Sequence, residues 1–167
     1  DVFSYVGGWG IQAACAGATQ VTCVDSSAGA IDSVHHNAKI NGLDNIETIE
    51  GDAFDALKAL CDEKEKFDIV VLDPPALIPR RRDQKAGEEA YARLNQLGLR
   101  LLGRDGLLVS ASCSMHLSQE KLTDIIRGSG RKIDRFVQLL EQGHQAPDHP
   151  VVPGIPETDY IKSCFVR

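Results

Sequence analysis

The chain has 167 residues, a length that fits one domain with a single core. Its 24 Asp and Glu residues outnumber its 18 Lys and Arg residues, and the net charge of −6 argues against a strong electrostatic grip on nucleic acid by this segment alone. No apolar run is long enough to span a membrane, and no signal peptide opens the sequence. We therefore expect a soluble, cytoplasmic domain over residues 1–167 that is a fragment of a longer protein, because it begins on a strand-like segment without Met.

The first predicted strand, residues 1–6, leads through the glycine turn of residues 7–10 into an alanine-rich helix over residues 11–18. Glycines in such a turn let the backbone approach a ligand and leave the amides of a helix N-terminus available to polar groups. Residues 8–13 also satisfy the dinucleotide pattern G-x-G-x-x-G/A, so an NAD-linked protein is one alternative.

Acids follow the next two predicted strands. The strand over residues 20–25 ends at Asp25, where the preceding glycine turn favours an acid that binds a ribose hydroxyl. The alternative, which can coexist with it, is a cap of the helix predicted over residues 28–40. The strand over residues 46–50 is followed by Asp52, whose carboxylate is open to two interpretations, an adenine contact or only a helix cap.

The most informative stretch is residues 67–75, which read FDIVVLDPP. Five of its first six residues are apolar, as in a central parallel strand that is buried on both faces. Because Pro74 and Pro75 cannot donate hydrogen bonds to a sheet, the strand must end there. Asp73 then stands at the carboxyl end of a strand, the edge at which open α/β sheets bind ligands.

A basic segment, residues 80–85, comes next, and a phosphate contact and a mobile cationic loop are equally plausible there. A helix is predicted over residues 88–102. Its expected inward stripe consists of Ala90, Leu94, Leu97 and Leu101.

The strand predicted over residues 107–112 runs into Cys113, which Ser112 and Ser114 flank. Because βα alternation makes this strand parallel to the one that ends at Asp73, both carboxyl ends are expected to open on one crevice. The other four cysteines lie in predicted helices or strands, where a free cysteine acts as a small hydrophobe. Only Cys113 is therefore placed to react. The spacing of the five cysteines fits neither a disulfide framework nor a metal site.

A helix over residues 118–130, with Ser118 as its N-cap, and two closing strands over residues 133–140 and 158–166 complete the chain. The alternation of strands and helices predicts an α/β fold with a doubly wound, mostly parallel sheet.

Taken together, these motifs resemble class I S-adenosylmethionine-dependent methyltransferases, and more narrowly the bacterial family that methylates C5 of a cytosine in large-subunit (23S) ribosomal RNA. The resemblance covers nearly the whole chain and implies a Rossmann-like, seven-stranded sheet. One departure is Ala76-Leu77, where the family often has a basic and then an aromatic residue. The matching motifs are Asp1-x-Phe-x-Tyr-x-Gly-Gly, Phe67-Asp with Asp73-Pro-Pro75, Tyr91-x-x-Leu-Asn95 leading to Leu101-Leu102, Ser112-Cys-Ser114 and Asp148-His-Pro150.

The resemblance implies S-adenosylmethionine as cofactor and no metal. It also implies ribosomal RNA as partner, recognised largely by an N-terminal PUA domain and a small intervening domain that this segment lacks, and it leaves a homodimer open. Residue by residue, it puts Tyr5 and Gly7 near the amino acid part of the cofactor, Asp25 with Ser26 at the ribose, Asp52 and Ala53 near adenine, Asp73 beside the transferable methyl group, and Cys113 as the nucleophile.

Cytosine C5 is a poor nucleophile, so its methylation needs a thiolate that adds at C6. The target base would have to be single-stranded or flipped out of its stack. Three alternatives stay open: methylation of a base nitrogen, which needs no cysteine; an NAD-linked oxidoreductase; and an inactive cofactor-binding module in ribosome assembly. For residues 148–150, a surface turn and an active-site wall are equally plausible.

Overall fold

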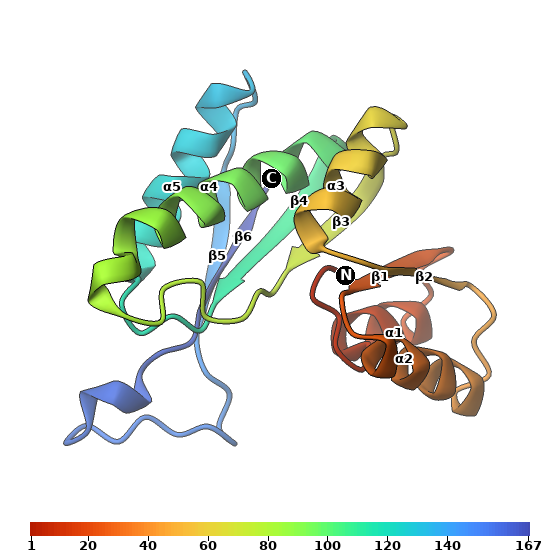
Figure 1. Cartoon of the computed structure of the whole chain (residues 1–167), viewed down its shortest axis with the longest axis horizontal. Helices are drawn as coiled ribbons and strands as arrows, with labels where there is room; N and C mark the ends of the chain where they lie inside the picture. The colour runs from red at the N-terminus through yellow and green to blue at the C-terminus, as the bar shows by residue number, and fades with distance from the viewer. The chain divides into compact units, whose positions relative to one another are not determined.

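A computed structural model describes all 167 residues of the chain, which divide into two compact units, residues 1–65 and residues 66–167. Figure 1 labels the helices and strands of both units. None of the helices combines the length and the apolar character that a membrane span requires.

The first unit contains α1 (Gly8–Cys15), β1 (Val21–Asp25), α2 (Ala28–Ile40), β2 (Ile46–Glu50) and α3 (Ala53–Asp62). Its two strands are parallel, and their register places Val21 opposite Ile46 and Asp25 opposite Glu50. Both strands therefore end at the same edge of this sheet. The core of the unit packs side chains of α1, β1 and α2 together, and Cys23 is fully buried within it.

The segment before α1 is not the strand that the sequence predicts. Val2 forms one isolated parallel bridge with Val24, while Phe3 and Tyr5 have φ angles of 64° and 48°. A non-glycine residue in this left-handed region leaves the extended path, so the strand pairing stops after a single bridge. Helix α1 then begins at Gly8, earlier than the predicted start at residue 11.

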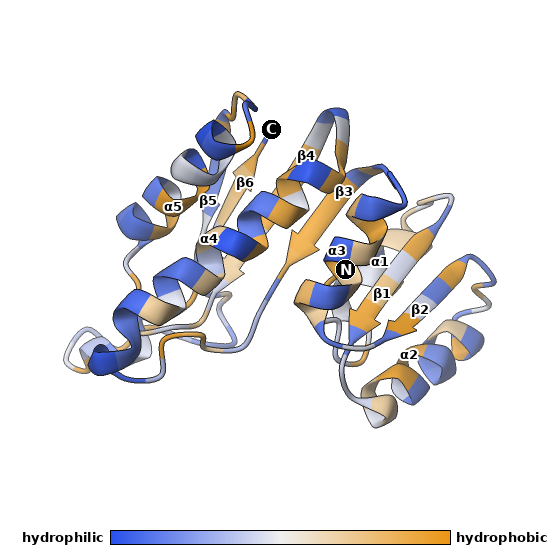
Figure 2. Cartoon of the chain, turned by 45° about the horizontal axis from the view of Figure 1, so that its top comes forward, coloured by the Kyte–Doolittle hydropathy of each residue, from blue (hydrophilic) through white to orange (hydrophobic).

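The second unit contains β3 (Phe67–Leu72), the 3₁₀ turn η1 (Arg81–Asp83), α4 (Gln84–Leu101), β4 (Leu102–Ser112), α5 (Gln119–Lys132), β5 (Leu139–Gly143), the 3₁₀ turn η2 (Pro156–Thr158) and β6 (Lys162–Val166). Its four-stranded sheet has the order β3-β4-β6-β5. Strands β3 and β4 are parallel, whereas β6 is antiparallel to both of its neighbours. Helices α4 and α5 lie side by side over one face of this sheet (Figures 1 and 2).

Strand β3 is the apolar strand that the sequence predicts, and it ends at Leu72 immediately before the Asp-Pro-Pro segment. Helix α4 packs closely on it, because a Cβ at Gly98 would lie 2.9 Å from Cδ1 of Leu72. Burial on both faces holds only for the second half of the strand. Val70 and Leu72 are buried, but Ile69 is 57% exposed.

The structure contains six strands, in the order β1-β2 in the first unit and β3-β4-β6-β5 in the second, so it shows part of the seven-stranded sheet that the resemblance implies. The missing strand is the first, which is reduced to the bridge at Val2. The closing strands are also shorter than predicted. Residue Ile133 is the C-cap of α5, so β5 starts only at Leu139, and β6 starts at Lys162 rather than at residue 158.

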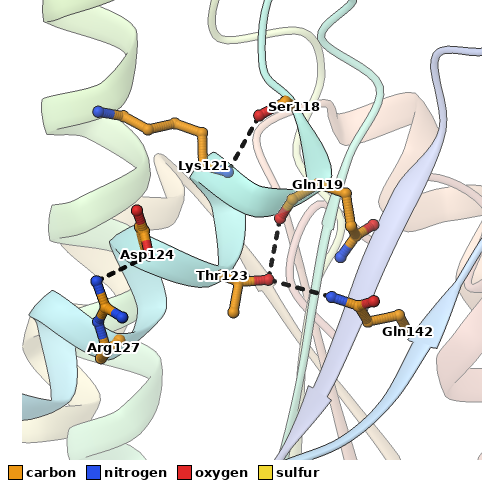
Figure 3. A network of polar contacts seen from close by, with 7 residues as sticks. All are labelled: Ser118, Gln119, Lys121, Thr123, Asp124, Arg127 and Gln142. Carbon is orange, nitrogen blue, oxygen red and sulfur yellow. Dashed lines mark hydrogen bonds and ion pairs between the residues drawn. The ribbon is translucent and has the colours of Figure 1, made fainter.

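Polar side chains tie α5 to the sheet (Figure 3). The N-cap prediction is confirmed, because Oγ of Ser118 accepts a hydrogen bond from the backbone N–H of Lys121 at 3.1 Å. One turn on, the hydroxyl of Thr123 donates to the carbonyl of Gln119 at 3.0 Å and accepts from Nε2 of Gln142, on β5, at 3.4 Å. These bonds fix the start of the helix that follows the Cys113 segment.

Candidate active site

In the first unit, Asp25 joins the end of β1 to the turn that precedes α1. Its Oδ2 accepts a hydrogen bond from the backbone N–H of Tyr5 at 2.8 Å, and its Oδ1 accepts one from the N–H of Ser27 at 3.0 Å. Ser27, not Asp25, caps α2, because Oγ of Ser27 accepts from the N–H of Ala30. The capping interpretation of Asp25 is therefore wrong. Each carboxylate oxygen has further lone pairs, so a ligand hydroxyl can still bind there.

The glycine turn is shaped by close packing. Gly7 has a φ of 86°, and a Cβ at this position would lie 2.9 Å from Cγ1 of Ile11. A Cβ at Gly10 would lie 2.5 Å from Sγ of Cys23, so α1 approaches β1 as closely as a glycine allows. The N-cap residue of α1, Gly7, has no side chain to cap the helix, but Oδ2 of Asp1 accepts a hydrogen bond from the N–H of Gly10 in the first turn at 2.9 Å. A Cβ at Gly8 would meet no atom within 4 Å, so the backbone is accessible at that residue.

Asp52 caps α3 through Oδ1, which accepts hydrogen bonds from the backbone N–H of Phe54 at 2.9 Å and of Asp55 at 3.2 Å. The capping interpretation of Asp52 is confirmed, and both bonds leave Oδ2 to a further donor. The N–H of Gly51 donates to the carbonyl of Asp25 at 2.9 Å, so the two acids follow adjacent strand ends.

Six of the residues predicted to bind the cofactor lie at the carboxyl edge of β1 and β2. Within this group Ser26 is exposed beside Asp25, and Ala53 is buried as the first residue of α3. Asp73 belongs to the second unit, and the expectation that it shares a crevice with the others stays a prediction. The six are Tyr5, Gly7, Asp25, Ser26, Asp52 and Ala53.

In the second unit, the thiol of Cys113 at the end of β4 points to the opposite side from the hydroxyls of its two neighbours. Ser112 is 1% exposed and Ser114 is fully buried, whereas Cys113 between them is partly exposed. Alternate residues of an extended chain point to opposite sides, so the serines face inward and the thiol faces the other way. Sγ of Cys113 lies 3.8 Å from the carbonyl oxygen of Pro74, the residue after Asp73. The structure therefore brings the predicted nucleophile to the Asp-Pro-Pro segment.

A buried tyrosine holds this arrangement in place. The hydroxyl of Tyr91, on α4, is hydrogen-bonded to Oγ of Ser112 at 2.8 Å and to Oγ of Ser114 at 3.0 Å. Oγ of Ser114 also accepts a hydrogen bond from the backbone N–H of Ile78, and the backbone of Leu77 bonds the tyrosine hydroxyl. This hydroxyl cluster connects α4, the end of β4 and the segment after Asp-Pro-Pro.

The inward stripe of α4 is therefore partly different from the predicted one. Leu94 is buried as predicted, but Ala90 and Leu97 are only partly buried. Tyr91 and Asn95 take the inward positions instead, and Nδ2 of Asn95 donates to the carbonyl of Tyr91 at 2.8 Å. A prediction that counts only apolar residues misses part of this inward face, because Tyr91 and Asn95 are polar.

The environment of Cys113 keeps its thiol protonated. Burial raises the pKa of Cys113, and the nearby carboxylate of Asp73 raises it further. The backbone N–H of Cys113 and the ammonium of Lys162 lower the pKa but do not outweigh burial. Since a free thiol already has a pKa near 8.5, ionisation of Cys113 at neutral pH needs a base or an additional positive charge.

Sequence reasoning missed Lys162, the first residue of β6, which is only 7% exposed. Its ammonium donates to backbone carbonyls next to Cys113. One signal was present in the sequence. In a strand with a two-residue period, Lys162 falls on the same side as Cys164 and Val166, which are both buried.

Other predicted features lie at the surface. Residues 148–150 form an exposed turn, as the first interpretation had it, with Nδ1 of His149 3.5 Å from a carboxylate oxygen of Asp148. Cys15 is exposed, which corrects the expectation that every cysteine besides Cys113 is packed among apolar residues. In the basic segment, residues 80–85, the guanidinium of Arg82 lies 3.8 Å from Asp83, and the side chains are mostly exposed.

A family model described as "Conserved hypothetical protein 95" matches residues 1–123. The chain belongs to this family. The matched range contains Asp25 and Asp52 of the first unit and Asp73 and Cys113 of the second. That description names no activity.

The chain is also similar to curated proteins. It is 38% identical over 169 residues to ribosomal RNA large subunit methyltransferase I of Klebsiella pneumoniae and 36% identical to the protein of the same name from Escherichia coli. These alignments cover 100% of this chain but 42% and 43% of the relatives. The chain thus spans about two fifths of the length of the curated relatives that it matches.

Solved structures identify the fold. A protein whose structure was determined with S-adenosylhomocysteine bound superposes with a TM-score of 0.85 at 22% identity, over 99% of this chain and 43% of the other. A SAM-dependent methyltransferase from Agrobacterium tumefaciens gives a TM-score of 0.70 at 21% identity, over 99% and 53% of the two chains. The α/β fold is that of class I methyltransferases.

Proposed function

We propose that this chain is the catalytic domain of an S-adenosylmethionine-dependent enzyme that methylates large-subunit ribosomal RNA, and that residues 1–65 and 66–167 together form this domain. The names of the curated relatives and the methyltransferase fold support the proposal. Recognition of the RNA would fall largely to parts of the protein outside this acidic segment, which carries a net charge of −6.

The carboxyl edge of β1 and β2 fits the cofactor. Asp25 offers carboxylate oxygens to the ribose hydroxyls, with Ser26 exposed beside it, and Oδ2 of Asp52 is available to the adenine amino group. The turn that runs past Tyr5 and Gly7 to Gly8 would take the cofactor's amino acid part, because a Cβ at Gly8 would meet no atom within 4 Å. The two acids match a ligand with a diol and a purine.

We propose further that the methyl group goes to C5 of a cytosine through a covalent adduct with Cys113. Bound S-adenosylmethionine supplies an electrophilic methyl group on a cationic sulfur. Once a base has taken the thiol proton, the thiolate of Cys113 would add to C6 of the base, and the C5–C6 electron pair would attack the methyl group and release S-adenosylhomocysteine. The carboxylate of Asp73 would accept a hydrogen bond from the protonated N3 or from the amino group and so favour the addition. A base then removes the C5 proton, the C5–C6 double bond re-forms, and the Cys113 thiolate leaves.

The observation that carries the mechanism is the orientation of the Ser-Cys-Ser segment. Both serines are buried and hydrogen-bonded to Tyr91, while the thiol between them is left partly exposed and lies against the backbone of Pro74. A purely structural thiol at the end of a strand would not need its neighbours to fix which side it faces. The thiol of Cys113 therefore lies beside Asp73, the exposed acid that would hold the target cytosine in place.

The test is methyl transfer by the full-length enzyme from labelled S-adenosylmethionine to ribosomal RNA that lacks the modification. Cys113→Ala should abolish transfer, because no other group can form the C6 adduct. Cys15→Ala, which removes an exposed thiol on α1, should leave transfer intact. Undiminished transfer by the Cys113 variant, or a labelled nucleoside other than 5-methylcytidine, would overturn the mechanism.

Methylation of a base nitrogen is the alternative within the same enzyme class. Such enzymes commonly place an aromatic residue after Pro-Pro to stack on the flipped base, and Ala76 occupies that position here. No observation in the structure favours this reaction over attack by C5. Nucleoside analysis of the product separates the two.

A further inference from the structure

Lys162 is a buried lysine, and its surroundings are unusual for one. It is 7% exposed and lies directly opposite Ser112 in the antiparallel pair of β6 and β4. Removing an ammonium from water is costly unless its donors are satisfied, so such a lysine is kept inside only by specific partners.

The partners of Lys162 are two carbonyls of the turn that follows Cys113. Nζ donates to the carbonyl oxygens of Ser114 and Leu117, each at 2.7 Å. The N–H of Leu117 also donates to the carbonyl of Ser114 at 3.1 Å, which closes the turn. Because Ser114 is the next residue after Cys113 in the sequence, these two hydrogen bonds fix the backbone that follows Cys113. Tyr91 fixes the serine side chains on either side of it.

The charge of Lys162 also acts on the thiol. Burial lowers the pKa of Lys162, and Cys113 and Asp159 raise it. In turn, Lys162 lowers the pKa of Cys113, against the larger effect of burial and the opposing carboxylate of Asp73. Tyr91 is the other titratable group that faces the thiol, and its pKa is raised mainly by burial. Lys162 is therefore the side-chain cation that opposes the effect of burial on the pKa of Cys113.

We propose that Lys162 is a positioning residue for the Cys113 thiol, which it serves in two ways: it fixes the turn of residues 114–117 by two hydrogen bonds, and it supplies a positive charge that favours the thiolate. This inference rests on the proposed role of Cys113 as nucleophile and identifies the group that prepares it. The charge is held by the fold before the substrate arrives, so it needs no rearrangement when the thiol reacts.

The test measures the thiol itself. The full chain is treated with iodoacetamide at a series of pH values, and the rate of modification of the Cys113 peptide is followed by mass spectrometry. Lys162→Met should move the midpoint of the rate profile to higher pH and slow alkylation at pH 7 by at least about threefold, because less thiolate is present. Lys162→Gln, which keeps a donor for the turn without the charge, should move the midpoint in the same direction.

Lys132→Met is the matched control, because it removes an exposed lysine from the end of α5. Its midpoint should equal that of the wild type. An unchanged midpoint in Lys162→Met, or an equal displacement in Lys132→Met, overturns the proposal. The measurement needs neither cofactor nor RNA, so it is independent of whether Cys113→Ala abolishes methyl transfer.

A second measurement leaves Lys162 in place, in case its variants do not fold. The titration of the Lys162 side chain is followed by NMR in the wild type and in Cys113→Ala, a change at a partly exposed site. Linkage is reciprocal, so removal of the thiol should move the titration of Lys162 to lower pH. Identical titrations in the two proteins would show that the groups are not coupled, and the proposal would fail.

Discussion

Replacing Tyr91 by Phe removes one buried hydroxyl and nothing else from the cluster around Cys113. The side chain is fully buried, and its hydroxyl is bonded to Ser112 at 2.8 Å and to Ser114 at 3.0 Å. A buried hydrogen bond contributes about 1 kcal/mol net, and more when a partner is left unpaired. Both serine oxygens keep one backbone donor, the N–H of Ile78 for Ser114 and that of Ser114 for Ser112, which limits the additional penalty.

The expected loss in the free energy of unfolding is therefore about 2 to 3 kcal/mol, at about 1 kcal/mol for each of the bonds to Ser112, Ser114 and the backbone of Leu77. Urea titrations followed by circular dichroism measure it, with Tyr160→Phe as the matched control. Tyr160 is only partly buried, and its backbone N–H, which the substitution leaves in place, donates to Oε1 of Gln145, so that variant should stay within about 0.5 kcal/mol of the wild type.

Methyl transfer should fall in Tyr91→Phe as well, because the serines no longer hold the thiol at one orientation. A loss of stability below about 0.5 kcal/mol, or one equal to that of Tyr160→Phe, would refute the argument that this hydroxyl joins α4 to the ends of β3 and β4.

Two further predictions concern the first unit. Gly10→Ala should lower the free energy of unfolding by about 2 kcal/mol in urea titrations, because its Cβ would lie 2.5 Å from Sγ of Cys23. Gly8→Ala, where a Cβ meets nothing within 4 Å, should cost less than about 0.5 kcal/mol, and equal losses would contradict the packing argument. Asp25→Asn should weaken the binding of S-adenosylhomocysteine in calorimetry at least about tenfold, since the amide is a weaker acceptor for ribose hydroxyls. Asp32→Asn, on the exposed side of α2, should bind as the wild type does, and an unchanged dissociation constant for the Asp25 variant would count against the assignment of the ribose site.

The sequence predicts most elements well where local signals mark their ends. Helix α2 and strand β2 have the predicted bounds, and β3 ends where the two prolines require it. Helix α5 begins directly after its predicted cap, Ser118. In each case a capping side chain, a proline or a change of hydrophobic period lies next to the boundary, so the information is local.

The failures come from long-range contacts. The apolar pattern of residues 1–6 resembles a strand, but the amide of Tyr5 binds the carboxylate of Asp25, and this bond accompanies a left-handed turn. Tyr91 lies on the inward face of α4 because its hydroxyl partners, Ser112 and Ser114, are at the end of β4, and Asn95 beside it donates to the carbonyl of Tyr91 itself. The burial of Lys162 depends on carbonyls at residues 114 and 117. The partners in these contacts are far apart in the sequence, so the sequence does not identify them, although the two-residue period of β6 does indicate the buried side of Lys162.

The motifs behind the family resemblance include residues whose contacts fix the structure around Cys113. In the second unit, Tyr91 is 21 residues before Ser112, and its hydroxyl binds both serines that flank Cys113. A strand end that must point a single thiol outward needs its neighbours fixed inward, and two buried hydroxyls fix them by direction as well as by packing. Alanine at these positions would still fit the core, but it would leave the Tyr91 hydroxyl without partners and the strand end free to twist. The two serines of the Ser-Cys-Ser pattern thus fix the direction in which the thiol between them points. For this reason the pattern is a more specific sequence signal than a lone cysteine.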